Sequence, residues 1–495
     1  MFTSICKGPA CLLAAITFIA VPTVALAQQT STPYTSTRAA FQQPADSAYR
    51  GLAARPYDSN AYLITASFND GEKSLAKEVG DLKADLEAWK ARALAKEAAA
   101  KKKAASKPSV KVGGRFMWDW ANFNQDANSM AQIGDDPPIA PGGDVQNGSE
   151  PRRARLFIKG DAFHIIDYKL QFAFDYSSTL HYKDLFFTVK ELPYLGHVRV
   201  GHYKEPFSLD QLTSSKYITF MERNLADVFA PARNVGIMAF DQSEDNRMTW
   251  AIGAFKDQIA DDPPTFHDDH AASAVTMRYT FTPWYDEASG GRGLLHTGVG
   301  YSYRDATRDR VRFRQRPESH LCCRVVDTGW IPTEDYQLFN AELACVYGPF
   351  SLQSEYIMTS VNRLGGGTAN FDGVYCQASY FLTGEHRRYR RSDGTFGRVK
   401  PFENFFRVRD ADGCMQMGMG AWEVAYRYSY LDLNDAGIIG GRVSDHTLGL
   451  NWYLNPYTRV MWNYVRSDVN RPPAGGGAAI DGAMDIFEMR AQIDF

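Results

Sequence analysis

The chain has 495 residues, of which 13% are aromatic and 40 are glycine, and its formal net charge at pH 7 is -3. This length allows several ordinary domains or one large β structure, and tyrosine and phenylalanine, which far outnumber tryptophan, suit strands better than helices. The near-neutral charge gives no overall sign of a nucleic-acid partner.

Residues 1–27 have the pattern of a secretory signal peptide. Lys7 supplies a positive start, the apolar run CLLAAITFIAVPTVALA follows, and Ala25-Leu26-Ala27 fits an A-x-A cleavage site. Because the run is short and ends in this pattern, we predict that the segment is removed; an uncleaved membrane anchor is the alternative. No later window of about 18 apolar residues predicts a transmembrane helix. That test does not detect transmembrane β-barrels, whose strands alternate apolar and polar residues.

The next segment divides into a low-complexity part and a helical part. Residues 28–72 are rich in Gln, Ser, Thr, Pro and Ala and are predicted to be weakly ordered. In residues 73–107 apolar residues recur at alternating spacings of four and three, as in the narrow seam of a coiled coil. The seam residues are Leu75, Val79, Leu82, Leu86, Trp89 and Ala93. We predict a periplasmic coiled-coil helix that associates with other copies and is followed by a spacer; a single amphipathic helix packed on the body of the protein is the alternative.

Residues 108–495 show the period-2 alternation of strands. In YKLQFAFDY the aromatic and aliphatic side chains of one parity oppose Lys169, Gln171 and Asp175 on the other. A continuous apolar face with aromatic residues at both ends is typical of a lipid-facing strand, and the polar face then lines a lumen. About sixteen such segments occur, an even number that suits an antiparallel bacterial barrel.

The connections between these segments alternate between short and long, as expected for short periplasmic turns and long external loops. Residues 384–417 break this alternation, because they form a long connection on the short-turn side. The last segment, IFEMRAQIDF, ends in Phe495, and an aromatic carboxyl terminus resembles the signal for outer-membrane assembly. We therefore predict an all-β fold, a 16-stranded antiparallel transmembrane β-barrel of the outer membrane with the N-terminal periplasmic coiled-coil helix.

Five segments carry a resemblance to a known family. In chain order they are VRVGHYKEPFSLDQLTSSKYITFMERNLADVFAPARNVGI, QASYFLTGEHRRY, GAWEVAYRYSYLDL, LGLNWYLNPYTRVMWNYV and RAQIDF. With these segments the chain resembles the phosphate-selective porin O/P family of Gram-negative outer membranes, over most of residues 111–495. The resemblance implies a homotrimeric sixteen-stranded porin, a constricting third external loop, and uptake of anions that are often phosphate or polyphosphate. It leaves the role of the N-terminal helix open.

An anion pore needs fixed positive charge along a narrow path. Arginine makes forked contacts with phosphate oxygens, whereas lysine acts as a compact point charge. The strands offer such groups at lumen positions of the second segment and of nearby segments: Arg153, Arg155, Lys159, Lys169 and Arg199. We predict that these residues line the anion pathway; the alternative is that they pair with acidic residues across the barrel.

Two basic clusters lie outside the strands. Arg310, Arg312 and Arg314 belong to RVRFRQR in an external connection, and Arg387 and Arg388 belong to HRRYRR at the start of the long connection. Both clusters are included in the predicted anion pathway. For the first, surface charge that binds lipopolysaccharide phosphates is the alternative. For the second, a solvated periplasmic turn is the alternative, and the resemblance favours placement inside the barrel.

The stretch TSSKYITFMER falls after the fifth strand, where the resemblance places the constricting loop. Lys216 is predicted to contact the anion, with Ser214 and Ser215 as hydroxyl donors. Glu222 and Arg223 are predicted to brace the loop against the barrel wall. Whether Lys216 faces the pore or is neutralised by a partner such as Glu222 stays open.

Other chemistries find little support in the sequence. The motifs GxSxG and HExxH and the Walker A pattern do not occur, so no enzymatic activity is predicted. The cysteines that remain after cleavage lack metal-ligand spacing, and one disulfide among them stays open. The acidic residues of 256–272 match no calcium loop and are predicted to be solvated. We predict no metal site and no cofactor.

The sequence thus predicts a porin for passive diffusion of small anions through a pore lined by Arg and Lys, and the resemblance implies that these anions are phosphate or polyphosphate. Its predicted partners are outer-membrane lipid and lipopolysaccharide, the anions, and further copies of the chain in a homotrimer. Two alternatives remain. One is a weakly selective general porin, which the net charge of -3 keeps open. The other is a structural tether from the outer membrane to the cell wall through the coiled coil.

Overall fold

The computed structural model describes residues 77, 80–92, 94, 96, 108–134, 140–174, 180–257, 272–409 and 413–495. The predicted signal peptide and the low-complexity segment lie outside these residues. So do Leu75, Val79 and Ala93 of the predicted seam, and most of the acidic connection 256–272.

Residues 80–92 are helical, as the heptad spacing predicts. The seam residues Leu82, Leu86 and Trp89 expose 69%, 51% and 67% of their surfaces. Association of this helix with other copies stays a prediction. None of the helices in the described residues combines the length and the hydropathy that crossing a membrane requires.

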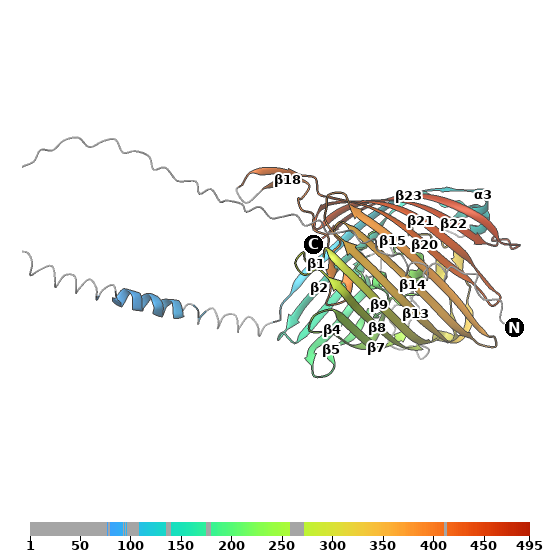
Figure 1. The fold of residues 1–495 in the computed structure, drawn as a ribbon. Helices are drawn as coiled ribbons and strands as arrows, with labels where there is room; N and C mark the ends of the chain where they lie inside the picture. The colour runs from blue at the N-terminus through green and yellow to red at the C-terminus, as the bar shows by residue number, and fades with distance from the viewer. Residues whose placement is uncertain are drawn as a thin grey trace, which may run out of the picture. The chain divides into compact units, whose positions relative to one another are not determined.

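Sixteen long strands of the described residues form one closed antiparallel sheet, the barrel in Figure 1. Strands adjacent in the chain pair with each other, and β1 closes the ring by pairing with β23. The predicted all-β, 16-stranded antiparallel barrel is therefore confirmed. The strands are β1 (Lys111–Gln125), β2 (Gly148–Ala162), β3 (Ile166–Phe174), β4 (Leu180–Leu192), β5 (Gly196–Lys204), β6 (Arg233–Gln242), β7 (Met248–Asp257), β8 (Ala272–Tyr285), β9 (Gly293–Asp305), β13 (Ile331–Tyr347), β14 (Phe350–Arg363), β15 (Thr368–Phe381), β20 (Ala421–Asp435), β21 (Ile438–Asn455), β22 (Thr458–Arg471) and β23 (Ile480–Asp494).

The strands alternate between an apolar outer face and a polar inner face. In β13, Phe339 and Leu343 are exposed on the outside, whereas Asn340 and Glu342, of the opposite parity, are buried inside. This inverts the arrangement of a soluble protein, because the outer face of a membrane barrel contacts hydrocarbon and the lumen is polar. The period-2 pattern of the sequence follows from that requirement.

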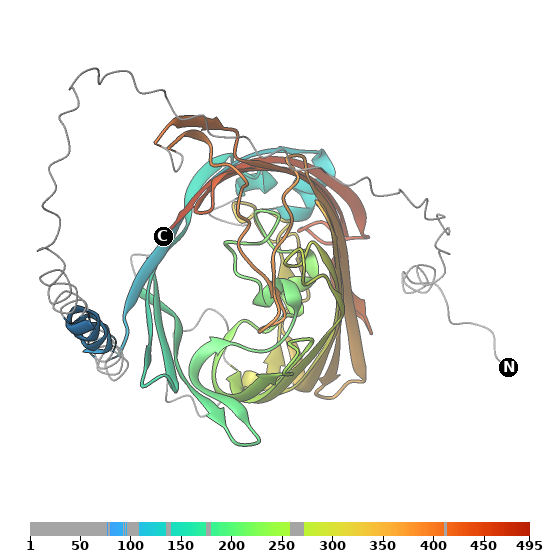
Figure 2. The ribbon, with the colours of Figure 1, turned by 60° about the vertical axis from the view of Figure 1, so that its left-hand side comes forward.

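Residues 205–232, between β5 and β6, fold into the barrel and are called the inward loop below (Figure 2). The loop contains α4 (Leu209–Leu212) and η3 (Leu225–Phe229). Its apolar side chains, Phe207 and Leu225 among them, join residues of the wall in one buried cluster. Burial of these side chains stabilises the loop in the lumen, because they would otherwise contact water.

Polar contacts fix the inward loop as well. The backbone N–H groups of Leu209 and Asp210 donate to the carboxylate of Glu355 on β14, at 2.9 and 2.8 Å. A glycine of the wall gives the loop room, since a Cβ at Gly373 on β15 would lie 2.8 Å from the Cβ of Ala226. Apolar packing and hydrogen bonds therefore hold the loop against the same part of the wall.

The other long connections contain further small elements. Residues 126–147 contain α3 (Ala127–Ile133) and η2 (Pro141–Gly143). Residues 306–330 contain η4 (Thr307–Asp309), β10 (Arg310–Val311), β11 (Arg314–Gln315) and β12 (Val326–Asp327), and residues 382–420 contain β16 (Tyr389–Arg390), β17 (Thr395–Phe396), β18 (Phe406–Arg409) and β19 (Met415–Gly418). The β16–β17 hairpin contributes to the lumen, whereas Phe405, beside β18, contacts Trp452 on β21 with ring centroids 4.5 Å apart.

Candidate functional site

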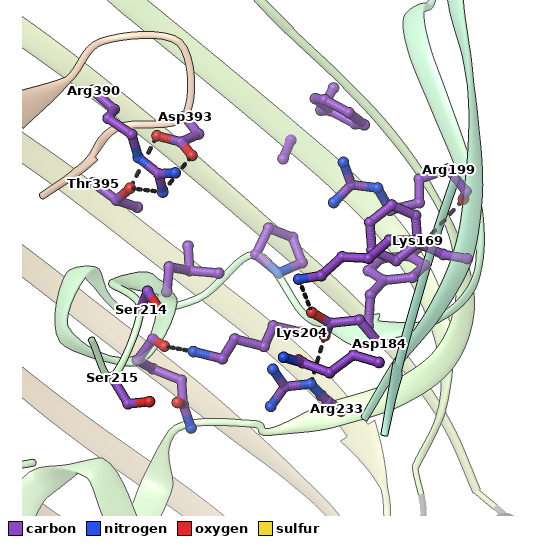
Figure 3. A pocket seen from close by; sticks show the side chains of 18 of the residues that line it. Lys169, Asp184, Arg199, Lys204, Ser214, Ser215, Arg233, Arg390, Asp393 and Thr395 are labelled. Carbon is purple, nitrogen blue, oxygen red and sulfur yellow. Dashed lines mark hydrogen bonds and ion pairs between the residues drawn. The ribbon is translucent and has the colours of Figure 1, made fainter. Parts of the chain in front are cut away.

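A cavity of about 480 Å³ lies in the lumen between the wall of β1 to β8, the inward loop and the β16–β17 hairpin (Figure 3). Its lining is strongly cationic. Among the residues that the structure describes, twelve lysines and arginines line it against three aspartates. The cations are Arg115, Arg153, Arg155, Lys159, Lys169, Arg199, Lys204, Lys216, Arg223, Arg233, Arg278 and Arg390, and the aspartates are Asp184, Asp241 and Asp393.

Five of these cations have no carboxylate within ion-pair distance in the described part of the chain: Arg115, Arg155, Lys159, Arg199 and Lys204. Neutral groups hold three of them in place. Arg115 donates from Nη1 to Ser215 Oγ at 2.7 Å, Lys204 donates to the carbonyl of Gln211, and Arg199 donates from Nε to Thr188 Oγ1 at 3.0 Å. Neutral acceptors orient a cation without adding a negative charge beside it, so these groups contribute net positive charge to the lumen.

Lys169 and Arg233 share one carboxylate. Both point at Asp184 in Figure 3, and Arg233 Nε lies 2.6 Å from Asp184 Oδ1. Two cations beside one anion leave this cluster with an excess positive charge. The aspartate therefore orders the two cations and reduces their field without abolishing it.

Lys216 also belongs to a cluster with an excess of positive charge. Its Nζ lies 2.9 Å from Asp494 Oδ2 on the last strand, and Arg398 binds the same carboxylate. The partner of Lys216 is thus Asp494 rather than Glu222. Ser214 and Ser215 line the same cavity, and Ser215 accepts the hydrogen bond from Arg115.

Glu222 and Arg223 make contacts that hold the inward loop in place. Glu222 accepts two hydrogen bonds from Arg152, at 2.8 and 2.9 Å, and one from Arg490 at 2.7 Å. Burial opposes ionisation of this carboxyl, but the guanidinium groups of Arg152, Arg153 and Arg490 outweigh it and hold the pKa of Glu222 well below its usual range. The predicted bracing role stays a prediction, and these contacts support it.

Arg223 acts within the loop. Its guanidinium donates to the carbonyls of Asp210, Gln211 and Thr213, at 3.0, 3.2 and 3.0 Å. One side chain thus binds carbonyl groups of α4 and of the residue that follows it. The loop backbone that carries Ser214 and Lys216 begins at this point.

The predicted cluster residues outside the strands do not line this cavity: Arg310, Arg312, Arg314, Arg387 and Arg388. In the external connection, Arg312 pairs with Asp327, and the guanidinium of Arg310 lies 4.2 Å from the ring centroid of Trp330. Arg314 belongs to β11 of the same connection. These residues are engaged in the fold of the loop itself, and their predicted part in the anion pathway stays a prediction.

The residues of the second segment, HRRYRR, differ in burial and in position. Arg387 is buried, with its guanidinium 3.7 Å from the ring centroid of Phe396 and a 2.9 Å hydrogen bond to Gln353. Arg388 is exposed. Only Arg390 of this segment, paired with Asp393 at 2.8 Å, lines the described cavity.

Sequence reasoning missed several lining residues. Arg115 stands on the polar parity of the first strand, and that parity was a usable signal. Lys204 and Arg233 stand at the strand ends that flank the inward loop, where the period-2 pattern stops and gives no direction. Asp184 on β4 pairs with Lys169 on β3, a contact that no sequence pattern indicates. Among the described residues, no group of three or more His, Cys, Asp or Glu side chains is arranged to hold a metal ion.

The similarity to known proteins covers the barrel part of the chain. The family described as "Phosphate-selective porin O and P" matches residues 110–495. Porin O of Pseudomonas aeruginosa is 27% identical over 427 residues, covering 78% of this chain and 88% of that protein. An uncharacterised protein of Caulobacter vibrioides is 29% identical over 358 residues, covering 70% of this chain and 68% of that one.

Solved structures show similar barrels. An anion-selective porin from Comamonas acidovorans matches with a TM-score of 0.48 and 14% identity, covering 78% of this chain and all of that one (100%). The outer-membrane channel DcaP of Acinetobacter baumannii matches with a TM-score of 0.45 and 11% identity, covering 78% of this chain and 97% of that one.

Proposed function

The chain belongs to the phosphate-selective porin O and P family, and from this premise we propose that it passes small anions by passive diffusion through the cationic cavity. Membership makes it a multi-pass β-barrel channel of the outer membrane and not an enzyme. The proposal concerns what the channel admits and which residues select it.

One observation carries the proposal: five cations that face a single cavity have no carboxylate partner in the described part of the chain. A fixed charge about 7 Å from a permeating ion, in water, changes the energy of that ion by about 0.6 kcal/mol. Each such cation therefore favours an anion over a cation of equal charge by roughly seven-fold at low ionic strength. Several together make a barrier to cations and a well for anions.

Phosphate-like anions fit the donors that are present. Arg155 offers a forked guanidinium donor, and Lys159 and Lys204 offer compact ammonium charges. Arg153, Arg155 and Lys159 also share one face of β2, with about 7 Å between alternate residues. Such a row of charge suits an anion with several phosphate groups, which supports the polyphosphate proposal.

We also propose how copies of the chain assemble. The exposed seam of Leu82, Leu86 and Trp89 supports self-association of the N-terminal helix, and a homotrimer with this helix in the periplasm is the arrangement we propose. A tether to the cell wall is the alternative use of the same helix. Deleting residues 73–107 separates the two, because loss of a tether damages the envelope and leaves the conductance of each pore unchanged.

Reversal potentials of the full chain in planar lipid bilayers, under a tenfold KCl gradient, test the proposed selectivity. We expect the wild type to prefer chloride, and Arg155→Gln to lower that preference several-fold. Arg442→Gln is the matched control, because Arg442 is an exposed strand arginine that pairs with Asp432 away from the cavity. A preference for potassium in the wild type would overturn the anion proposal. Equal potentials for Arg155→Gln and Arg442→Gln would remove Arg155 from the pathway.

A further inference from the structure

The lumen carries an apolar surface that anion passage alone does not require. Phe157 on β2, Phe186 on β4, and Met238 and Phe240 on β6 all line the cationic cavity. Side chains that face the lumen of a membrane barrel are normally polar. Large apolar groups on the wetted side of the wall therefore need an explanation.

Packing within the wall explains only part of this surface. Tyr203, Met238 and Phe255 are almost completely buried, and they form a small apolar core against the inner side of β5 to β7. Phe186 and Phe240 lie on the edge of that core and keep part of their surface open to the cavity. Phe157 stands outside the core and is half-buried as well. Three phenylalanine rings thus remain accessible from the lumen.

A guanidinium stands at the same place. Arg199 Cζ lies 4.2 Å from the ring centroid of Phe186 and 4.9 Å from that of Phe240, so the two rings hold its plane by cation–π contact. Its Nε donates to Thr188, and its two terminal amines donate no hydrogen bond within the described part of the chain. Arg199 is therefore a positioned cation whose terminal N–H groups have no hydrogen-bond acceptor among the described residues.

Lysines border the third ring in the same way. Lys159 Nζ and Lys169 Nζ lie 5.6 and 5.9 Å from the ring centroid of Phe157. The cavity thus combines cations and accessible rings on one side of the lumen. Its volume of about 480 Å³ lies in the range of about 300–1,000 Å³ that organic ligands occupy.

We propose that the cavity has affinity for organic anions that carry an aromatic ring, with a carboxylate held by Arg199 and Lys169 and the ring against Phe157, Phe186 and Phe240. This inference rests on the proposed anion pathway and adds a substrate class to it. An anion without an apolar group meets only the cations. Covering about 50 Å² of an aromatic ring corresponds to roughly an eight-fold gain in affinity.

Benzoate and acetate are the probes, because they share a carboxylate and differ in the ring. The full chain is placed in planar bilayers in symmetric KCl, and each salt is added until the chloride current is halved. We expect benzoate to reach half-block at a concentration roughly eight-fold lower than acetate. Phe157→Ala and Phe240→Ala are each expected to remove most of that difference, because each raises the half-block concentration of benzoate more than that of acetate.

Phe187→Ala is the matched control, because Phe187 follows Phe186 in β4 but is exposed on the outer face of the barrel. It is expected to keep the full difference between the two salts. Equal half-block concentrations in a wild type that still prefers chloride would overturn this inference and leave the anion pathway standing. Potassium preference in the same bilayers would overturn both. A difference that survives in both Phe157→Ala and Phe240→Ala would show that these rings do not hold the solute.

Discussion

Glu222→Gln tests whether the inward loop sets the width of the pore. The carboxylate of Glu222 joins the loop to Arg152 on β2 and to Arg490 on β23, at 2.7 to 2.9 Å. Glutamine has nearly the same size, but it is neutral and has one acceptor oxygen in place of two. The substitution therefore weakens the attachment without changing the volume of the side chain.

The structure sets the size of the effect. Arg490 keeps two hydrogen bonds to Asp119, at 2.7 and 2.6 Å, so its charge stays compensated in the variant. Arg152 loses its forked contact, and hydrogen bonds to charged groups contribute about 1.5–3 kcal/mol each. The side chains of Arg152 and Glu222 are 17% and 15% exposed. Water therefore offsets part of the lost contact, and we expect the free energy of loop attachment to fall by about 3 kcal/mol. A loss of about 3 kcal/mol raises the population of a detached loop roughly 150-fold.

Single-channel recording of the full chain measures this population. We expect Glu222→Gln to show frequent excursions to a higher conductance that the wild type shows rarely. Glu287→Gln is the control, since Glu287 makes one exposed ion pair with Arg391 at 2.6 Å at a short turn. A Glu222→Gln channel with the conductance and noise of the wild type would refute the reasoning that this carboxylate holds the loop.

Three further predictions concern charge and pH. The pKa of Glu222 is depressed in the folded protein, so the stabilising contribution of this carboxylate is complete above the ordinary glutamate pKa of about 4.3. That contribution is lost only as pH falls through the depressed pKa. Channel noise that rises between pH 7 and pH 5 would contradict this prediction. Asp184→Asn removes the carboxylate between two cavity cations and is expected to raise the chloride preference by up to roughly seven-fold in dilute salt, read as a reversal potential. Lys216→Glu places a second carboxylate beside Asp494 and is expected to move the reversal potential toward that of potassium, whereas an unchanged potential would exclude Lys216 from the pathway.

The barrel and the faces of its strands were predictable because they depend on short-range pattern. Alternate residues of a strand point to opposite sides, and in a membrane barrel one side contacts lipid and the other side contacts the lumen. Arg153, Arg155 and Lys159 share the inner face of β2, and all three line the cavity. The basic residues of the loops had no such pattern behind them. Arg312 pairs with Asp327 and Arg387 donates to Gln353, and neither side chain lines this cavity.

The sequence by itself determined the strands and which parity of each strand is polar, because strand parity is a local property of the chain. Only the tertiary structure decided which of the lumen charges are balanced. Lys216 and Asp494 are 278 positions apart, and they meet because β23 closes the barrel beside the place where the inward loop returns to the wall. An ion pair depends on closure of the whole ring and on the path of one loop, and neither is contained in the spacing of neighbouring residues.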